Sequence, residues 1–136
     1  MIEEIHEVPA AFQAHADWLR TRGQAGRRFN GQHLDMRSID LSGVDLSECA
    51  LGYANLSGMD LSGFEFVGAH LVDCDFRSCN LAGASFHKAT LDGSDFRGTS
   101  VEGTRFTRAS FIGTNMKGVD LSKALIDRRR LLYAIV

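Results

Sequence analysis

Residues able to do acid–base chemistry recur in this sequence at intervals of twenty. Asp40 is followed by Asp60, and Asp75 is followed by Asp95. If the chain returned to the same place after each interval, the two carboxylates of a pair would lie about 4.8 Å apart, the spacing of neighbouring strands. Two charges at that distance raise the pKa of one carboxyl group, as a general acid requires. Paired carboxylates are therefore the first chemistry that the sequence suggests.

A structural role explains these carboxylates better. The same position of a five-residue repeat holds Asp or Asn along most of the chain: Asp40, Asp45, Asn55, Asp60, Asp75, Asn80, Asp95, Asn115 and Asp120. A short polar side chain at this position can bond the backbone of a turn, whether it is a carboxylate or an amide. We therefore interpret the position as part of the turn and not as a catalytic group.

The other reactive residue types do not gather into a site. The histidines fall on different segments, without metal-ligand spacing: His6, His15, His33, His70 and His87. The cysteines occupy small inward positions, where cysteine acts as a compact apolar residue: Cys49, Cys74 and Cys79. The sequence shows neither a serine nucleophile with a plausible base nor a phosphate-binding glycine loop. We expect no catalytic site, no metal, no cofactor and no enzyme activity.

Large apolar residues recur every five positions, from Met36 to Ile126. An α-helix turns about 100° per residue, so a five-residue step would scatter these side chains around the helix. A strand alternates its side chains between two faces, so an odd step would send every second one into water. The chain must therefore change direction once in every repeat, so that each large residue returns to the same interior.

Each repeat sends a second, mostly small side chain inward, two positions before the large one. Ala54, Cys74 and Ala84 are examples. Residues two apart share one face of an extended segment, and the polar residue between them points outward. Glycine ends many repeats, among them Gly43 and Gly63, and a turn with positive φ is easiest for glycine. One repeat is thus a short extended side followed by a tight turn.

A longer period of twenty residues indicates how many sides close one coil. Phenylalanine recurs at Phe66, Phe86 and Phe106, and again at Phe76 and Phe96. Four sides of about three extended residues make a square roughly 10 Å across, which facing side chains fill without leaving a channel. The sequence therefore predicts an all-β solenoid of about five stacked coils.

The runs YANLSG, GVDLSE, MDLSG and CNLAG make this sequence resemble the pentapeptide repeat family, whose motif is A(D/N)LXX. The resemblance covers residues 29–126 and implies a right-handed quadrilateral β-helix, the handedness that parallel crossovers also prefer. The first coil departs from the motif, since Gly31 stands where a large residue belongs, and Phe29 and Leu34 exceed the usual small residue. Terminal repeats are commonly atypical because they meet a cap.

Both ends of such a solenoid need covering, because the outer coils would otherwise expose unpaired edges. Residues 1–28 are predicted to form an N-terminal helical cap and lead-in, and their "H..WL...G" arrangement is similar to a lead-in of many bacterial and phage pentapeptide repeats. Residues 127–136 are predicted to form a short helix or tail. In gyrase-protecting members of the family, a similarly placed helix and tail form a homodimer interface. The candidates here for either a dimer interface or a simple cap are Leu131, Leu132, Ile135 and Val136.

Two charged surfaces are candidate interaction sites. A basic ladder is predicted on one side from Arg77, Arg97 and Lys117. An acidic patch is predicted in the first half from Asp40, Asp45, Asp60 and Glu65. Because the ladder runs beside a column of Asp and Asn, we expect charge pairs between neighbouring coils. With a net charge of -2 and no long apolar run, the chain is expected to be cytoplasmic and without a membrane span.

These features favour a non-enzymatic protein–protein interaction module, a rigid rod whose protein partner the sequence does not identify. The alternative, which the family resemblance implies, is a DNA-mimic-like modulator or protector of a type II topoisomerase, gyrase. Between Gly31 and Ile126 there are twelve acidic and eight basic residues, a weak excess for imitating DNA. Direct binding of nucleic acid by the basic ladder is the least favoured reading, since binding to phosphates needs an excess of basic residues.

Overall fold

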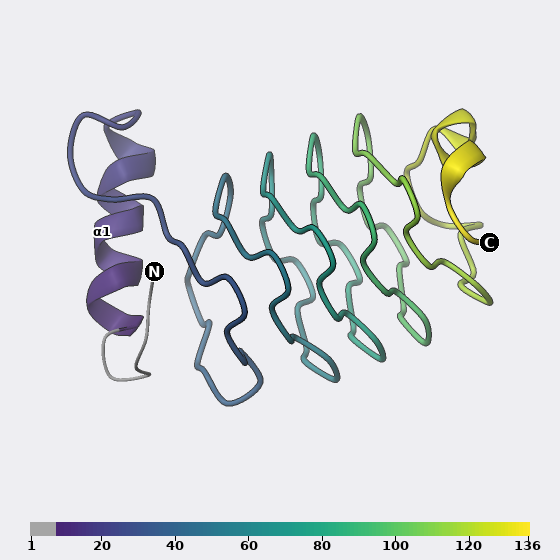
Figure 1. Cartoon of the computed structure of the whole chain (residues 1–136), viewed down its shortest axis with the longest axis horizontal. Coiled ribbons are helices and arrows are strands. Elements are labelled where there is room, and N and C mark those ends of the chain that lie inside the picture. Colours follow the sequence, from purple (N-terminus) through teal and green to yellow (C-terminus); the bar gives the residue numbers. More distant parts are fainter. Residues whose placement is uncertain (1–7) are drawn as a thin grey trace.

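The computed structural model describes residues 8–136, so His6 and the start of the predicted N-terminal cap lie outside the described residues. Helix α1 (Val8–Arg20) stands across one end of a rod, and the 3₁₀ helix η2 (Arg128–Tyr133) lies at the other end (Figure 1). Between them the chain runs as a stack of similar coils (Figure 1). The rod therefore presents side faces on which no other helix of the described residues lies.

Isolated parallel β-bridges join the coils, because each side is too short for a longer strand. Asn30 pairs with Ala50, Ala50 pairs with His70, and Asp75 pairs with Asp95. Every bridge joins residues twenty positions apart, which is the period that the phenylalanine spacing predicts. An outward residue on one coil therefore lies beside the residue twenty positions later.

Two stacks of phenylalanine rings fill the centre of the rod. The ring centroids of Phe66 and Phe86 are 5.1 Å apart, and those of Phe86 and Phe106 are 5.4 Å apart. Phe76 stacks on Phe96 with centroids 5.0 Å apart, and the rings of Phe76 and Phe86 are nearly perpendicular with centroids 5.6 Å apart. All five rings are fully buried. Offset and edge-to-face contacts are favourable for aromatic pairs, so the rings stabilise the stacking of the central coils.

Inward hydroxyl groups are satisfied by the backbone of the preceding coil. The Oγ1 of Thr104 donates to the carbonyl of Leu81 at 2.6 Å, and that of Thr114 donates to the carbonyl of Leu91 at 2.7 Å. In residues 8–136 no buried side-chain nitrogen or oxygen lacks a hydrogen-bond partner. The small inward series can therefore hold Thr without the cost of an unsatisfied buried group.

Turns with positive φ end the repeats, also where glycine is missing. Gly83 and Gly103 have φ values of 70° and 69°. Glu48, Lys88 and Arg108, which occupy the same place in other repeats, have φ values of 59°, 62° and 60°. A side chain in this conformation is disfavoured, so the stacking of the coils must hold these three residues there.

Helix α1 packs over the first coil through a buried histidine. The Nδ1 of His15 accepts a hydrogen bond from the N–H of Phe29 at 2.9 Å. Its Nε2 therefore carries the proton, which it donates to the carbonyl of Ser47 at 2.9 Å. The rings of Phe12 and Phe29 lie 4.8 Å apart. The helix is thus joined to the first coil by polar and apolar contacts.

Candidate binding surfaces

The basic ladder is built from arginines that are each held by an aspartate of the same repeat. In Arg97, the Nε donates to Asp95 at 3.0 Å and a terminal nitrogen donates at 2.6 Å. Arg77 bonds Asp75 in the same way, at 3.0 and 2.8 Å. The backbone N–H of each arginine also donates to its aspartate, at 3.1 and 3.0 Å. Each aspartate therefore holds both the turn and the guanidinium group of its arginine.

The prediction of charge pairs between neighbouring coils is wrong, because each Arg–Asp pair of the ladder forms within one repeat. Arg77 and Asp75 are two positions apart in the sequence, as are Arg97 and Asp95. The turn brings these two side chains together locally, and the fork of the guanidinium group matches both carboxylate oxygens. Lys117 has only a backbone link of this kind, from its N–H to the Asn115 Oδ1 at 3.1 Å. The ladder therefore displays two oriented guanidinium groups and one ammonium group.

The arginine bonds also exclude Asp75 and Asp95 as an acid–base pair. Their β-bridge places them side by side, as predicted. The hydrogen bond from Arg77 lowers the pKa of Asp75, and the hydrogen bond from Arg97 lowers the pKa of Asp95. A general acid needs a raised pKa, so these two carboxylates are ionised at neutral pH and unsuited to that role.

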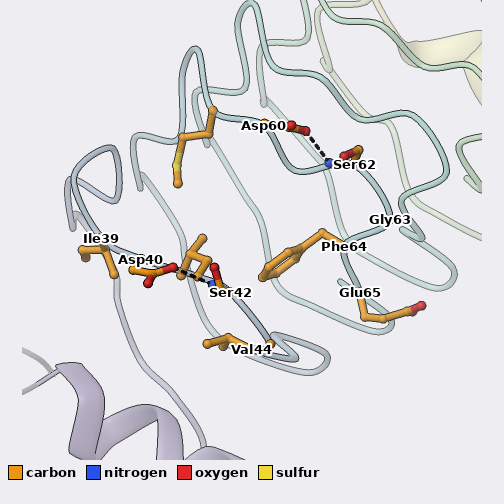
Figure 2. A pocket seen from close by; sticks show the side chains of 12 residues that line it. Ile39, Asp40, Ser42, Val44, Asp60, Ser62, Gly63, Phe64 and Glu65 are labelled. Carbon is orange, nitrogen blue, oxygen red and sulfur yellow. Dashed lines mark hydrogen bonds between the residues drawn. The ribbon is translucent and has the colours of Figure 1, made fainter.

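A cleft, here called the N-terminal cleft, separates residues 39–44 from residues 59–65. Its volume is about 470 Å³, within the range of ligand pockets. In Figure 1 the first corner at the lower edge of the rod stands away from the next one, whereas the later corners are stacked evenly. Figure 2 shows Ile39 and Val44 on one side of the cleft, and Phe64 on the other. The first two coils are therefore separated at one corner only.

The backbone pairing that joins later coils is missing across this cleft. At the same corner one coil further on, the N–H of Leu61 donates to the carbonyl of Asn80 at 2.8 Å, and that of Ser85 donates to Phe64 at 2.9 Å. Across the cleft, four N–H groups have no backbone partner among residues 8–136: those of Leu41, Gly43, Asp60 and Glu65. The facing carbonyls also accept no backbone N–H there: those of Ile39, Val44, Asp60 and Ser62. Asp40 and Asp60 are accordingly not joined by a bridge, so their predicted stacking is wrong.

Side-chain size at the small inward positions differs between the open and the closed parts of this corner. At this corner the central coils hold small residues: Cys79, Ala84, Thr99 and Thr104. The first two coils hold large ones at the equivalent positions: Ile39, Val44, Met59 and Phe64. These four side chains are only partly buried. Large side chains on both facing coils therefore accompany the opening, as overpacking of a narrow interior would produce.

Three of the four predicted acidic residues line the cleft. Asp40, Asp60 and Glu65 lie in its wall, which contains no lysine or arginine. Asp45 lies outside it and accepts a hydrogen bond from the N–H of Ser47 at 2.8 Å. Hydrogen bonds from Ser42 and Ser62 lower the pKa of Asp40 and Asp60, respectively (Figure 2). Both carboxylates are therefore ionised at neutral pH, and the cleft is acidic.

The four candidate residues at the C-terminus divide into two groups. Leu131 is partly buried and packs against the core. Leu132 and Val136 are 75% and 72% exposed, and Ile135 is half exposed although its backbone pairs with Thr114. Tyr133, which was not among the candidates, adds a further exposed ring to this end. The tail therefore combines one side chain that packs against the core with an exposed apolar surface.

The cysteines are buried, and burial raises the pKa of each thiol, that of Cys79 to about 11. They are therefore protonated and unreactive at neutral pH. Within residues 8–136 no group of three or more His, Cys, Asp or Glu side chains is placed to hold a metal ion. None of the helices in the described part of the chain has the length and apolar character to cross a membrane.

The bridges at intervals of twenty residues and the ring stacks define a class of protein, a β-solenoid. A family model described as "Pentapeptide repeat region" matches residues 35–106, and a second, "Pentapeptide repeats (8 copies)", matches residues 93–126. The chain belongs to the pentapeptide repeat family, whose members form right-handed quadrilateral β-helices.

Solved structures of the same family resemble this chain. A pentapeptide repeat protein (Rfr23) from the cyanobacterium Cyanothece 51142 is 22% identical, with 79% of this chain and 81% of that chain covered and a TM-score of 0.62. That similarity supports the fold.

Two other structures match less well. HetL from Nostoc sp. strain PCC 7120, involved in heterocyst differentiation regulation, is 24% identical over 68% of this chain and 44% of its own, with a TM-score of 0.33. A variant of QnrB1, a plasmid-mediated fluoroquinolone resistance protein, is 26% identical over 62% of this chain and 42% of its own, with a TM-score of 0.36. Among curated proteins, none matches this chain.

Proposed function

We propose that this chain is a non-enzymatic protein-binding module. The observation that carries the proposal is the fixed display of two oppositely charged surfaces, the basic ladder and the acidic N-terminal cleft. Arg77 and Arg97 are held by their aspartates before any partner arrives, so a partner need not order them. Complementary charge affects the rate and the specificity of association more than it affects the affinity. A cytoplasmic setting is part of the proposal and is supported by the free, buried cysteines.

Capture from a bacterial lysate on the immobilised chain tests this proposal. One variant combines Arg77→Ala, Arg97→Ala and Lys117→Ala, and a second combines Asp40→Asn, Asp60→Asn and Glu65→Gln. A matched control, Arg105→Ala with Lys123→Ala, removes basic groups away from the ladder. We expect at least one protein that the control retains and that one of the two triple variants loses. If no captured protein depends on either surface, the proposal fails.

We further propose a homodimer through the C-terminal end. The exposed apolar side chains of Leu132, Tyr133, Ile135 and Val136 support it, because burial between two copies would remove them from water. Scattering mass of the full chain, compared with Leu132→Ser combined with Val136→Ser, tests it. The full chain should have twice the mass of the variant. A monomer mass for the unaltered chain at high concentration excludes the dimer and leaves the tail as a cap.

Protection of a type II topoisomerase by partial DNA mimicry is the second candidate. The acidic wall of Asp40, Asp60 and Glu65 favours it, because it gathers negative charge without a lysine or arginine in the same lining. The basic ladder on another side restricts any such mimicry to this end of the rod. A supercoiling assay with gyrase and a quinolone tests it. Unchanged inhibition by the drug at micromolar protein would count against this candidate.

A further inference from the structure

We propose that the N-terminal cleft binds an extended segment of a partner protein, one that alternates basic and apolar residues and adds as a strand between the first two coils. The inference rests on the proposed binding function and names the site and the chemistry of the partner. It is drawn from the unpaired backbone, the charge and the apolar lining of the cleft.

The unpaired backbone gives the cleft an affinity for a strand. The N–H groups of Leu41 and Gly43 on one wall and those of Asp60 and Glu65 on the other have no backbone partner within residues 8–136. An extended peptide carries donors and acceptors at the spacing of a neighbouring strand, so it can pair with both walls. Sheet edges of this kind are templates for added strands.

The charge of the walls selects the partner's polar residues. Asp40, Asp60 and Glu65 line the cleft, and none of its lining residues is basic. The three carboxylates would repel an acidic segment and attract lysine or arginine. A segment of mixed charge would leave part of this wall uncompensated. The cleft is therefore matched to a basic strand.

The lining also explains why every second residue of the partner should be apolar. Leu41 forms part of the buried core, and Val44 and Phe64 are partly exposed beside it. Successive side chains of a strand point to opposite faces, so one set can contact these apolar residues while the other set meets the carboxylates. Simple closure of the cleft is disfavoured, because the large side chains that line it would first have to repack.

A smaller cleft at the far end of the same corner shares the unpaired backbone, since the N–H groups of Val101 and Asp120 also have no backbone partner among residues 8–136, but it differs in size and charge. It has a volume of about 240 Å³ and is lined by Thr99, Val101, Glu102, Asp120 and Lys123, among others. Its Lys123 lies 3.7 Å from Glu102, so its charge is partly compensated within the chain. Size and charge together therefore distinguish the N-terminal cleft from this second opening.

The test uses the full chain and a capped hexapeptide of alternating lysine and valine as the probe. Amide NMR should show shifts and slower exchange at Leu41, Gly43, Asp60 and Glu65 when the peptide is added. A glutamate–valine hexapeptide should bind at least about tenfold more weakly, since like charges at an interface oppose association. A lysine–valine peptide with N-methylated backbone nitrogens should also lose binding, because it lacks the donors of a strand.

Matched variants locate the binding. Asp40→Asn, Asp60→Asn and Glu65→Gln in one chain keep the shape of the walls and should weaken the lysine–valine peptide about tenfold. Glu102→Gln, which removes a carboxylate elsewhere on the rod, should leave binding unchanged. A thermal melt of the triple variant shows whether it is folded. The single Asp60→Asn variant provides the same test with a smaller loss if the triple variant is not.

Several results would overturn the proposal. Amides of Leu41 and Gly43 that exchange as slowly in the free protein as those of Leu61 and Gly63 would mean that the cleft is closed. Equal binding of both hexapeptides would remove the role of charge, and shifts that grow with protein concentration alone would assign the cleft to a second copy. The proposed binding function fails separately, since a captured partner that depends only on the basic ladder would leave that function intact.

Discussion

One corner of this rod is open in the first two coils and closed in the central ones. In the centre, Leu61 and Ser85 pair across neighbouring coils through their backbone N–H groups. In the first two coils the equivalent groups have no backbone partner among residues 8–136. The side chains at the small inward positions differ, since Phe64 at the opening corresponds to Ala84 in the centre. At this corner the pairing is lost where both facing coils carry large side chains, whereas Phe64 still accepts the N–H of Ser85 from the coil that carries Ala84.

The largest effect should come from emptying the closed centre. Phe86→Ala removes a fully buried ring that stacks on Phe66 and Phe106, and should reduce the free energy of unfolding by about 3–5 kcal/mol. Phe64→Ala at the cleft should cost clearly less, because that ring is only partly buried. Denaturant unfolding of the two variants measures the difference. Equal losses would mean that the first corner is as tightly packed as the centre.

A larger side chain at the closed corner should reduce the free energy of unfolding by less, but it should change the structure of that corner. Ala84→Phe places the side chain of Phe64 at the equivalent position of the centre and should destabilise the fold by about 1–3 kcal/mol through overpacking. It should also open the pairing there, so that the amides of Ser85 and Arg105 exchange faster. Hydrogen exchange measures this, with Leu71→Met as a control that conserves core volume. Unchanged exchange at Ser85 would show that bulk at this position is not what parts the coils.

The sequence predicts the closed centre better than the open corner. The spacing of Phe66, Phe86 and Phe106 predicts one column, and their rings do stack, because a fixed period places each one over the last. The sizes of Val44 and Phe64 are also visible in the sequence. The opening of the corner cannot be predicted from these sizes, because it depends on the distance between two particular backbones. The repeat motif describes an average coil and gives no account of this departure.

The charged residues show a similar limit. Their columns follow from the period of twenty, so the alignment of Asp75 with Asp95 is predictable. The partner of each arginine is not, because Arg97 could reach an aspartate on its own repeat or on a neighbouring coil. The turn decides this, since it places the N–H of Arg97 and its guanidinium group against the same carboxylate. Local geometry therefore determined the pairing.

The two ends of the rod should also differ in their response to acid. Burial lowers the pKa of His15 below its ordinary value of 6.5, although Asp45 and Glu48 oppose this shift. The contribution of neutral His15 to the stability of the folded state is therefore fully present above about pH 6.5. This contribution is lost as the pH falls through the lower pKa that His15 has in the folded protein. Protonation also ends the hydrogen bond that Nδ1 accepts from Phe29.

Thermal melts between pH 7.5 and pH 5 measure this loss, roughly the range in which histidine titrates. The melting temperature should fall across that range, and amides near Phe29 should lose protection before those of η2 at the other end. His15→Gln cannot be protonated, so its melting temperature should vary less with pH. A variant with the same pH dependence as the unaltered chain would assign the effect to other groups.

The smallest effect on stability should come from the basic ladder. Arg97→Ala removes an exposed guanidinium group whose bonds to Asp95 lie at the surface, and water replaces most of what such a pair contributes. Its melting temperature should therefore stay close to that of the unaltered chain, whereas Phe86→Ala lowers it strongly. Binding should show the reverse order, because a partner of the ladder contacts Arg97 and not the buried ring. A large loss of stability in Arg97→Ala would mean that the ladder supports the fold, and its fixed arginines would then need no partner to explain them.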